Sequence, residues 1–381
     1  GAESEILWGR AYGGVYLVEE LAKILGIRDV LRGALKRSKI ASPVEQGIVG
    51  MIANRCIAQQ SKLRVDEWLK EDVYFPKAEE IRLQHLYRGM DFLESNKDMI
   101  EKDLYLKTRD LFNRRVDIVF YNITTIYIEG RGEEESFQYG YRPDRKQVVV
   151  GLSVDRDGLP LSSMLFSGST IDAKTIDEMI GRLSGLEVGR VVFVCDRGMV
   201  SEENLKLIES AGYGYLVGVK LRELKAVRDE VLSVKGRFQK VSEKLEVKDV
   251  EVGGRRYIVC YNPQEAERDK AIRDEVIREL EAEIEKINKG SLSACVVKDS
   301  ALKRRYVREL KTGKLTLDRA KIRQESLYDG KYVLLTTERE LSAGELALQY
   351  KNLFRVERAF RVELCPIYHR VKAHLTLCVL S

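Results

Sequence analysis

The sequence predicts an α/β protein in which a mixed β-sheet with flanking helices follows a helical N-terminal domain. Residues 1–115 place apolar side chains at helical spacing, whereas from Val116 onward runs rich in β-branched and aromatic residues appear. Three strand-like runs come in succession, and a strand, a helix and another strand follow them. This order predicts one sheet with helices packed against it.

Length and composition are those of a globular protein. The chain has 381 residues, 44% apolar and 33% charged, which is enough for two or three domains with a hydrophobic core. Its net charge of +5, from 65 basic and 60 acidic side chains, permits a nucleic-acid partner without requiring one. No run of about 18 apolar residues occurs and the opening GAESEILWGR lacks the layout of a signal peptide, so we expect a cytoplasmic protein without a membrane segment.

The cysteines and histidines do not form a metal motif. The six cysteines include no CxxC pair and lie mostly within apolar runs, which predicts buried, reduced thiols. The three histidines lack the HExxH spacing of a zinc hydrolase. These patterns argue against a disulfide framework and against a zinc site.

Residues 1–115 are expected to form the helical domain. The segment VYLVEELAKILGIRDVLRGAL is amphipathic, Pro43 suits a first helical turn with Ser42 as its cap, and residues 78–112 predict one or two long amphipathic helices. The region contains no catalytic constellation. It is either a scaffold or dimerisation module, or an arm that binds DNA ends through lysines and arginines on its exposed faces.

Residues 116–221 are expected to form the first part of the sheet. Val116–Glu129 predicts a long buried strand, and QVVVGLSVDRDGLPLSSMLFSG predicts two strands joined by a tight turn, which together form an antiparallel meander. A helix over Ile171–Leu183, the buried strand RVVFVC, a helix that Gly212 ends and the strand YGYLVGVK follow.

Residues 222–330 are expected to be an insertion into the sheet domain, which resumes over 331–381. EVGGRRYIVCYN predicts a short hairpin, and residues 264–288 predict a long helix whose alternating charges are typical of a solvated face. GKYVLLTT predicts the next strand. The helix after it extends to residue 364, with Ser342 as N-cap and Glu345 at the capping-box spacing.

Three residues are candidates for a site. Asn122 lies in the middle of a strand, where an amide without partners would cost about 1–3 kcal/mol, so it is either satisfied locally or part of a site. Asp196 ends a strand and either caps the next helix or binds a metal. Glu357 either forms a surface ion pair with Arg358 or Arg361 or completes the site.

Four segments carry a family resemblance. FYNITTIYIEG, the run from QVVVGLSVD to TIDAKT, VVFVCDRGMVSEENLKLIESAGYGYLVGVK, and YDGKYVLLTT with YKNLFRVERAFR follow one another in the order of a known family. They resemble the DDE transposases of bacterial insertion sequences, in the insertion-sequence-four-like superfamily, over about residues 110–381. The resemblance implies an RNase H-like catalytic core with an insertion between its second and third acidic residues.

The resemblance also implies a metal-binding catalytic trio. It aligns Asn122 with the first Asp, Asp196 with the second, and Glu357, seven residues after Tyr350, with the Glu. It implies Mg²⁺ as the cofactor, with Mn²⁺ as a substitute, and cleavage and strand transfer of DNA. The implied partners are double-stranded DNA, as transposon ends and target, and a second copy of the chain in a homodimer. The candidate DNA-binding residues are Arg197, Tyr350, Arg355, Arg358 and Arg361.

The sequence departs from the family pattern. Asn122 replaces an acid, and its neutral amide oxygen is a weaker ligand for a divalent ion. Asp117 is five residues away, so in a regular strand it points to the opposite face. Leu353 and Leu364 stand where the family has an arginine and a lysine, and two stretches look shortened. We expect impaired catalysis. Two alternatives remain: a catalytically silent DNA-binding descendant, and another RNase H-like nuclease.

Overall fold

The computed structural model describes residues 9–40, 43–111, 116–127, 138–139, 146–170, 172–186, 188–189, 191–196, 201–219, 230–353 and 371–381. The chain divides into two compact units, which are described separately below. The first comprises Gly1–Gly214 and Asn352–Ser381, and the second comprises Tyr215–Lys351. The division into functional domains at residues 1–115, 116–221, 222–330 and 331–381 stays a prediction.

The first unit opens with a layer of helices, as predicted. Its helices are α1 (Gly13–Ile24), α2 (Ile27–Arg37), α3 (Val44–Ile57), α4 (Lys62–Glu71), the short 3₁₀ helix η1 (Ala78–Glu80) and α5 (Leu83–Leu111). Helix α3 begins directly after Pro43, whereas the predicted cap Ser42 lies outside the described residues. The long amphipathic segment forms the single 29-residue helix α5.

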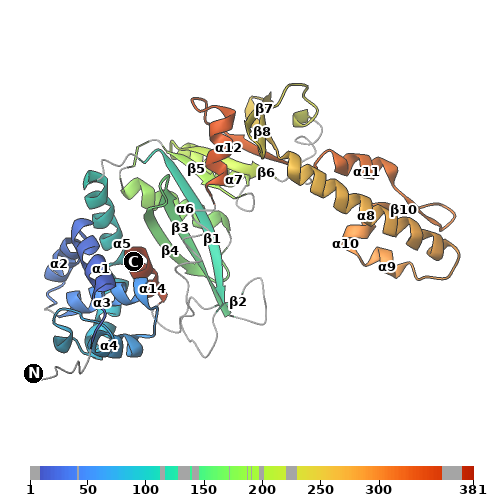
Figure 1. Cartoon of the computed structure of the whole chain (residues 1–381). Helices are drawn as coiled ribbons and strands as arrows, with labels where there is room; N and C mark the ends of the chain where they lie inside the picture. The colour runs from blue at the N-terminus through green and yellow to red at the C-terminus, as the bar shows by residue number, and fades with distance from the viewer. Residues whose placement is uncertain are drawn as a thin grey trace, which may run out of the picture. The chain divides into compact units, whose positions relative to one another are not determined.

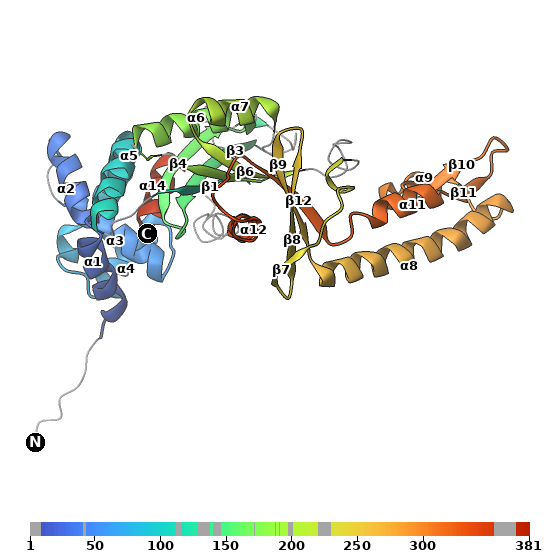
Figure 2. The same ribbon diagram turned by 90° about the horizontal axis from the view of Figure 1, so that it is seen from above.

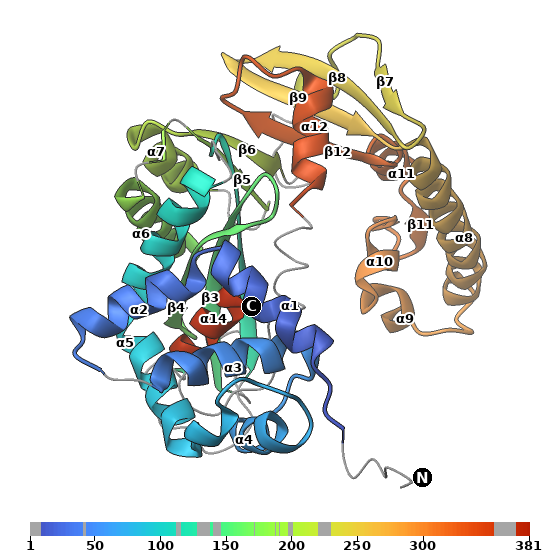
Figure 3. The same ribbon diagram turned by 60° about the vertical axis from the view of Figure 1, so that its left-hand side comes forward.

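Helix α14 (Val371–Leu380) completes the hydrophobic core of this helical layer. Its side chains Ala373, Leu377 and Leu380 are buried in the same cluster as residues of α1 to α5. The Sγ atom of Cys56 on α3 also donates a hydrogen bond to the carbonyl oxygen of Ser381 (3.3 Å). Figure 3 shows α14 next to α3. Residues more than 250 positions apart in the chain therefore share one core.

The first unit also contains a mixed sheet, which confirms the predicted α/β architecture. Strands β1, β3 and β4 form the predicted antiparallel meander, and β5 pairs with β1 in parallel. Helix α6 (Asp172–Gly185) follows β4, and α7 (Glu202–Ser210) begins at Ser201, whose side chain caps it. The strands are β1 (Ile118–Tyr127), β2 (Gln138–Tyr139), β3 (Lys146–Asp155), β4 (Pro160–Ser167) and β5 (Val192–Cys195).

A buried polar network fixes α5 on β4. Lys97 Nζ pairs with Glu101 Oε1 at 2.6 Å, and both side chains are almost fully buried. Glu101 accepts hydrogen bonds from the backbone N–H of Ser163 (3.1 Å) and from the hydroxyls of Ser163 and Ser162. Lys97 also donates to the carbonyl oxygen of Ser163. Each charge therefore has partners, which a buried ion pair requires.

The second unit contains an antiparallel sheet in the order β6-β12-β9-β8-β7. The hairpin of β8 and β9 is the one predicted from EVGGRRYIVCYN. Helix α12 (Ala343–Lys351) follows β12 and packs on β8 and β9. The strands are β6 (Gly214–Val219), β7 (Gln239–Ser242), β8 (Leu245–Val252), β9 (Arg255–Tyr261) and β12 (Lys331–Thr336).

Between β9 and β12 the chain builds a subdomain that we call the arm, residues 262–330. The arm has its own small core, in which Val276, Leu280 and Ile284 of α8 pack with Val297, Tyr306 and Leu315. Figures 1 and 2 show α8 running alongside the shorter elements. These elements are α8 (Pro263–Asn288), α9 (Cys295–Lys298), α10 (Ala301–Arg304), β10 (Val307–Glu309), β11 (Leu315–Leu317) and α11 (Arg319–Ser326).

The two chain segments at the base of the arm are fastened to each other. The N–H of Asn262 donates to the carbonyl oxygen of Gly330 (2.8 Å), and the N–H of Gly330 donates to Asp269 (2.9 Å). Gly330 has a φ of +61°, and a Cβ there would lie 2.4 Å from the carbonyl oxygen of Asn262. Arg273 pairs with Asp329 nearby. Only glycine fits at this crossing.

The thiols and the hydropathy of the helices partly follow the predictions. The five described cysteines are free, and Cys195, Cys260 and Cys378 are buried as expected. Cys56 and Cys295 are exposed, contrary to the expectation: Cys56 lies at the end of α3 and Cys295 at the start of the short helix α9. Cys365 lies outside the described residues. None of the helices that the structure describes is long and apolar enough to cross a bilayer.

Candidate functional site

Asn122 and Asp196 follow directly on two residues that pair across neighbouring strands. In the parallel ladder of β1 and β5, Tyr121 lies opposite Cys195, and the next residue of each strand segment is a site candidate. Parallel neighbours lie about 4.7–4.9 Å apart, and side chains in register point to the same face. Asp196 is the first residue after β5, so the ladder extended by one position brings it next to Asn122, on the face opposite Tyr121.

The opposite face is closed by packing. Tyr121 is fully buried, and its hydroxyl donates a hydrogen bond to the carbonyl oxygen of Thr175 on α6 (3.2 Å). A Cβ on Gly151 of β3 would lie 2.7 Å from that hydroxyl, so the tyrosine ring requires glycine there. Asn122 is half-buried and Asp196 is exposed. The candidate site therefore lies on the face that is open to solvent.

The side-chain oxygen of Asn122 has a local partner. Its Oδ1 accepts a hydrogen bond from the backbone N–H of Ile123 at 2.8 Å. An amide oxygen carries a second lone pair, which stays available for a ligand. Of the two alternatives raised by the sequence, local satisfaction is present, and it leaves room for a role in a site.

Asp117 does not join these two residues. It lies just before β1, five positions from Asn122, and pairs with Arg156 (Oδ2 to Nη2, 2.7 Å) on the surface. An odd separation along a strand directs the two side chains to opposite faces. This arrangement agrees with the expectation that Asp117 cannot replace the missing acid.

The donor atoms on the open face are oxygens. Cys195 shares the face of Tyr121, and burial raises the pKa of its thiol to about 12, so no thiolate is available. A carboxylate and an amide oxygen are ligands that suit a hard divalent ion such as Mg²⁺. Within the described ranges, no three His, Cys, Asp or Glu side chains gather as a metal site. The third candidate, Glu357, lies outside those ranges.

Several other predicted site residues also lie outside the described residues. They are Arg197, Arg355, Arg358 and Arg361. Tyr350 is described: it lies on α12, half-buried, with its ring stacked on that of Tyr332 at 6.1 Å between centroids. Helix α12 ends at Lys351, and Asn352 and Leu353 lie in a turn, so the prediction of one uninterrupted helix to residue 364 is wrong at this point. Residues 354–364 lie outside the described residues.

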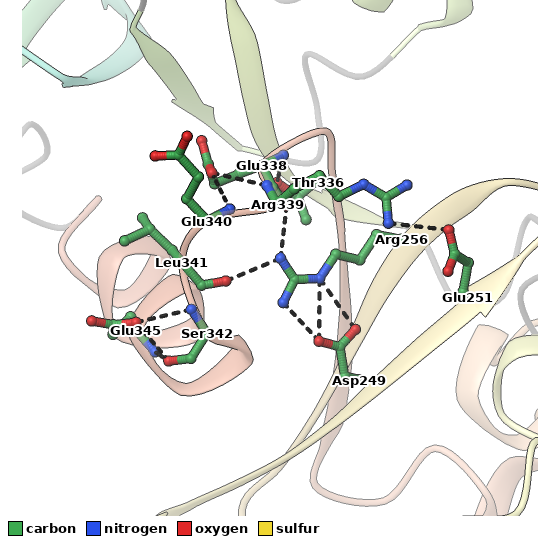
Figure 4. A network of polar contacts seen from close by, with 10 residues as sticks. All are labelled: Asp249, Glu251, Arg256, Thr336, Glu338, Arg339, Glu340, Leu341, Ser342 and Glu345. Carbon is green, nitrogen blue, oxygen red and sulfur yellow. Dashed lines mark hydrogen bonds and ion pairs between the residues drawn. The ribbon is translucent and has the colours of Figure 1, made fainter.

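The beginning of α12 is fixed by two devices. The predicted capping box is present: Ser342 Oγ accepts from the N–H of Glu345 (3.3 Å), while Ser342 donates to the Glu345 carboxylate. In addition, Arg256 of β9 donates to the carbonyl oxygens of Glu338 (2.7 Å) and Leu341 (3.0 Å) and pairs with Asp249, as Figure 4 shows. The Arg256 contacts fix the loop that precedes α12 against the sheet.

Sequence reasoning missed the Arg256 contacts and the Lys97–Glu101 network. The partners of Arg256 are backbone carbonyls more than 80 residues away, and no local pattern marks such a contact. Lys97 and Glu101 did leave a signal. They occupy positions of α5 at which the buried stripe of Leu86, Met90, Leu93 and Ile100 demands apolar residues. A charged pair at i and i+4 on an apolar stripe indicates a buried ion pair.

Comparison with known proteins identifies the family. Residues 123–364, more than half of the chain, match the model of the family described as "Transposase DDE domain", a class of DNA-rearranging enzymes. The chain therefore belongs to the DDE transposase family. The matched range contains Asp196 and Glu357 and begins one residue after Asn122.

The chain was also compared with curated proteins and with solved structures. No curated protein matches the sequence. Among solved structures, a piggyBac transposase in a synaptic complex with hairpin DNA is similar at 10% sequence identity, with a TM-score of 0.40, over 95% of this chain and 71% of that one.

Proposed function

We propose that this protein is a DNA transposase of the insertion-sequence-four-like group, with an RNase H-like catalytic core that binds the ends of its own element. Membership of the DDE transposase family carries this proposal. The family resemblance of the motifs around Asp196 and Glu357 supports it, and so does the register that sets Asn122 beside Asp196.

In this proposal, Asn122, Asp196 and Glu357 hold the metal site. Asp196 supplies a carboxylate at the end of β5, and Asn122 supplies one amide oxygen from β1. Mg²⁺ or Mn²⁺, when bound, would activate the attacking water or 3′-hydroxyl and stabilise the leaving oxygen. The protein's own part is to hold the oxygens in place on rigid strands. The closed packing of Tyr121 behind them serves that purpose.

Asn122 should reduce the activity of this chain. The first acid of the family pattern contributes a negative charge to the site, and an amide contributes none. Divalent ions of this kind prefer carboxylates, so we infer weak metal binding and weak cleavage, while the shape of the site stays nearly unchanged. The amide and a carboxylate have almost the same size, which is why the strand would tolerate either.

The remaining parts of the proposal concern DNA and assembly. Arg197, Tyr350, Arg355, Arg358 and Arg361 are proposed to contact DNA, because phosphate neutralisation supplies a large share of the affinity of DNA-binding proteins. The helical layer of the first unit is proposed to bind element ends or to join two copies of the chain. A homodimer would hold two ends together for strand transfer.

The test compares the unmodified chain, with Asn122, with its Asn122→Asp variant. Both are incubated with Mg²⁺ or Mn²⁺ and duplex DNA that carries the ends of the element, and nicking and joining are measured. We expect the Asp form to cut at least tenfold faster. Asp117→Asn, at a carboxylate already paired with Arg156, is the matched control and should leave the rate unchanged.

A catalytically silent DNA-binding descendant is the second candidate, and Asn122 is the observation that favours it. It would bind end DNA while neither form cuts. Cutting without preference for element ends and without joining would instead indicate another nuclease of the same fold. If the Asp117→Asn control cut DNA as fast as the Asn122→Asp variant, the assignment of the site would be wrong.

A further inference from the structure

The arm separates charge of opposite sign onto different elements. Helix α8 carries nine acidic and five basic side chains, a net charge of −4. The segment from Lys298 to Arg323 carries ten basic and three acidic side chains, a net charge of +7. A net charge of +5 for the whole chain therefore conceals a strongly basic segment of 26 residues.

The hairpin of β10 and β11 has an inner and an outer face. Val307 pairs with Leu317 and Glu309 with Leu315, and the three apolar members of these pairs pack against the core built on α8. Side chains alternate along a strand, so Arg308 and its partner Thr316 point the other way. By the same alternation Lys314, next to Leu315, lies on the outer side.

The basic residues that face α8 or a neighbouring carboxylate are neutralised. Lys303 pairs with Glu283 at 2.7 Å and with Glu279 at 3.3 Å, both on α8. Lys298 pairs with Glu309 at 2.9 Å. Arg305 reaches the buried Glu325 at 3.4 Å. Lys303 therefore fastens the segment to α8, whereas Lys298 and Arg305 are neutralised by carboxylates of other elements of the arm.

The outer residues have no such partner. Arg308, Lys311 and Lys314 are exposed, and no described carboxylate pairs with any of them. Lys311 lies in the turn that two hydrogen bonds close, from the Leu310 N–H to the Lys314 carbonyl oxygen and from the Gly313 N–H to the Leu310 carbonyl oxygen. The three side chains therefore belong to one small hairpin. We call these three residues the basic hairpin. Salt screens exposed charges only beyond the Debye length, about 8 Å at physiological ionic strength, so like charges on neighbouring residues of one hairpin repel each other.

We propose that the basic hairpin binds the phosphate backbone of double-stranded DNA without reading its sequence. This inference rests on the proposed function. Arginine and lysine without carboxylate partners match a row of phosphates, whose counterions they would release. The aromatic residues of the arm, Tyr306 and Tyr328, are both buried, so within residues 262–330 no ring is available to stack on unpaired bases. The face therefore fits a duplex rather than a single strand.

The test measures binding of the full chain to a fluorescent 30-base-pair duplex of arbitrary sequence, without divalent metal, across salt concentrations. The test variant is Arg308→Gln, Lys311→Gln and Lys314→Gln together. Each phosphate contact contributes about 0.9 to the slope of log K against log salt, so the slope should fall by up to about 2.7. At about 0.1 M salt the dissociation constant should rise at least about tenfold.

The matched control is Arg268→Gln, Lys270→Gln and Arg278→Gln, which removes the same charge from exposed positions of α8 on the same arm. It should change the dissociation constant less than threefold. Thermal unfolding of both variants checks that the arm is folded. If the control loses as much affinity as the test variant, binding follows net charge alone and the inference is wrong.

Other outcomes are equally decisive. An unchanged slope for a folded test variant would exclude the basic hairpin from the DNA interface, as would preferential binding of single strands. The same duplex assay separates this inference from the proposed function. If Asn122→Asp cuts DNA but the basic hairpin variant binds normally, only this inference fails. If the hairpin contributes to binding but no form ever cuts, only the catalytic proposal fails.

Discussion

Lys97 and Glu101 form an ion pair inside the first unit, one turn apart on α5, with only 2% and 5% of the two residues exposed. The backbone and hydroxyl of Ser163 complete the pair from β4. Because a buried charge is tolerated only with partners, the helical layer and the strand layer depend on each other at this point.

Replacing Lys97 with Met should destabilise the first unit strongly. The substitution keeps the volume of the side chain but leaves the carboxylate of Glu101 buried without a cation, which costs about 3–5 kcal/mol. Urea unfolding measures the effect. The control is Lys102→Met on the exposed side of the same helix, which should change the free energy of unfolding by less than about 0.5 kcal/mol. Equal effects of the two substitutions would refute the argument.

Replacing Arg256 with Met should loosen the loop before α12. The carbonyl oxygens of Glu338 and Leu341 would each lose a donor, at a cost of about 1–3 kcal/mol for a buried acceptor. Hydrogen exchange of residues 337–345 should accelerate. Arg339→Met is the control, because Arg339 is 53% exposed and pairs with Glu251 on the surface, a contact worth less than about 1 kcal/mol. Unchanged exchange in Arg256→Met would count against the fixed loop.

Replacing Gly330 with Ala should disrupt the base of the arm. The positive φ costs about 1–2 kcal/mol for any residue with a Cβ. The close approach of the Asn262 carbonyl adds about 1–3 kcal/mol. Gly290→Ala is the control, since Gly290 also has a positive φ (+76°) but no atom within 4 Å of a new Cβ. Denaturation of both variants isolates the contact, and a similar loss in both would show that the crossing is not tight.

The stability of the first unit should fall as His85 becomes protonated. Burial, and then the charges of Arg88 and Arg82, lower the pKa of His85, and its Nδ1 accepts the N–H of Arg82 at 3.1 Å. Because the native pKa lies below the unfolded value of about 6.5, the unfolded chain binds the proton first as the pH falls. The contribution of neutral His85 to the free energy of unfolding is therefore complete above about pH 6.5. It is lost as the pH falls from there through the pKa of His85 in the native state.

The measurement is the free energy of unfolding at pH 8 and pH 5, for the unmodified chain and for His85→Gln. Glutamine does not titrate, so the variant should lose less stability between the two values. All other groups are common to both proteins and cancel in the comparison. Parallel pH profiles would show that His85 does not contribute.

The neighbouring positions of Asn122 and Asp196 follow from features that a sequence records. Strand order, the β-branched runs and the period of two along a strand predict which residues share a face. The capping box of Ser342 and Glu345 is local and was equally predictable. Contacts of this kind depend on nearby residues or on regular geometry, so a single sequence contains the information.

Other features depend on distant partners and could not be predicted. The sequence gives no sign that Ala373 and Leu377 of α14 belong with the helices at the start of the chain, because any apolar helix would fill such a place. The helix over residues 264–288 was predicted to have a solvated face, and the structure shows in addition that α8 buries Val276, Leu280 and Ile284 in the core of the arm. The acidic residues of α8 and the basic residues that follow it are separate in the sequence, and only the structure shows which of them form ion pairs.

Helix α14 is synthesised last, although it packs on helices from the start of the chain. About 260 residues separate the end of α5 from the start of α14, and a ribosome adds about 5–20 residues per second. For roughly 13–52 s during synthesis, therefore, the apolar surface of α3 and α5 that α14 covers in the folded protein stays exposed. The folding of the first unit is therefore completed only after the second unit has been made.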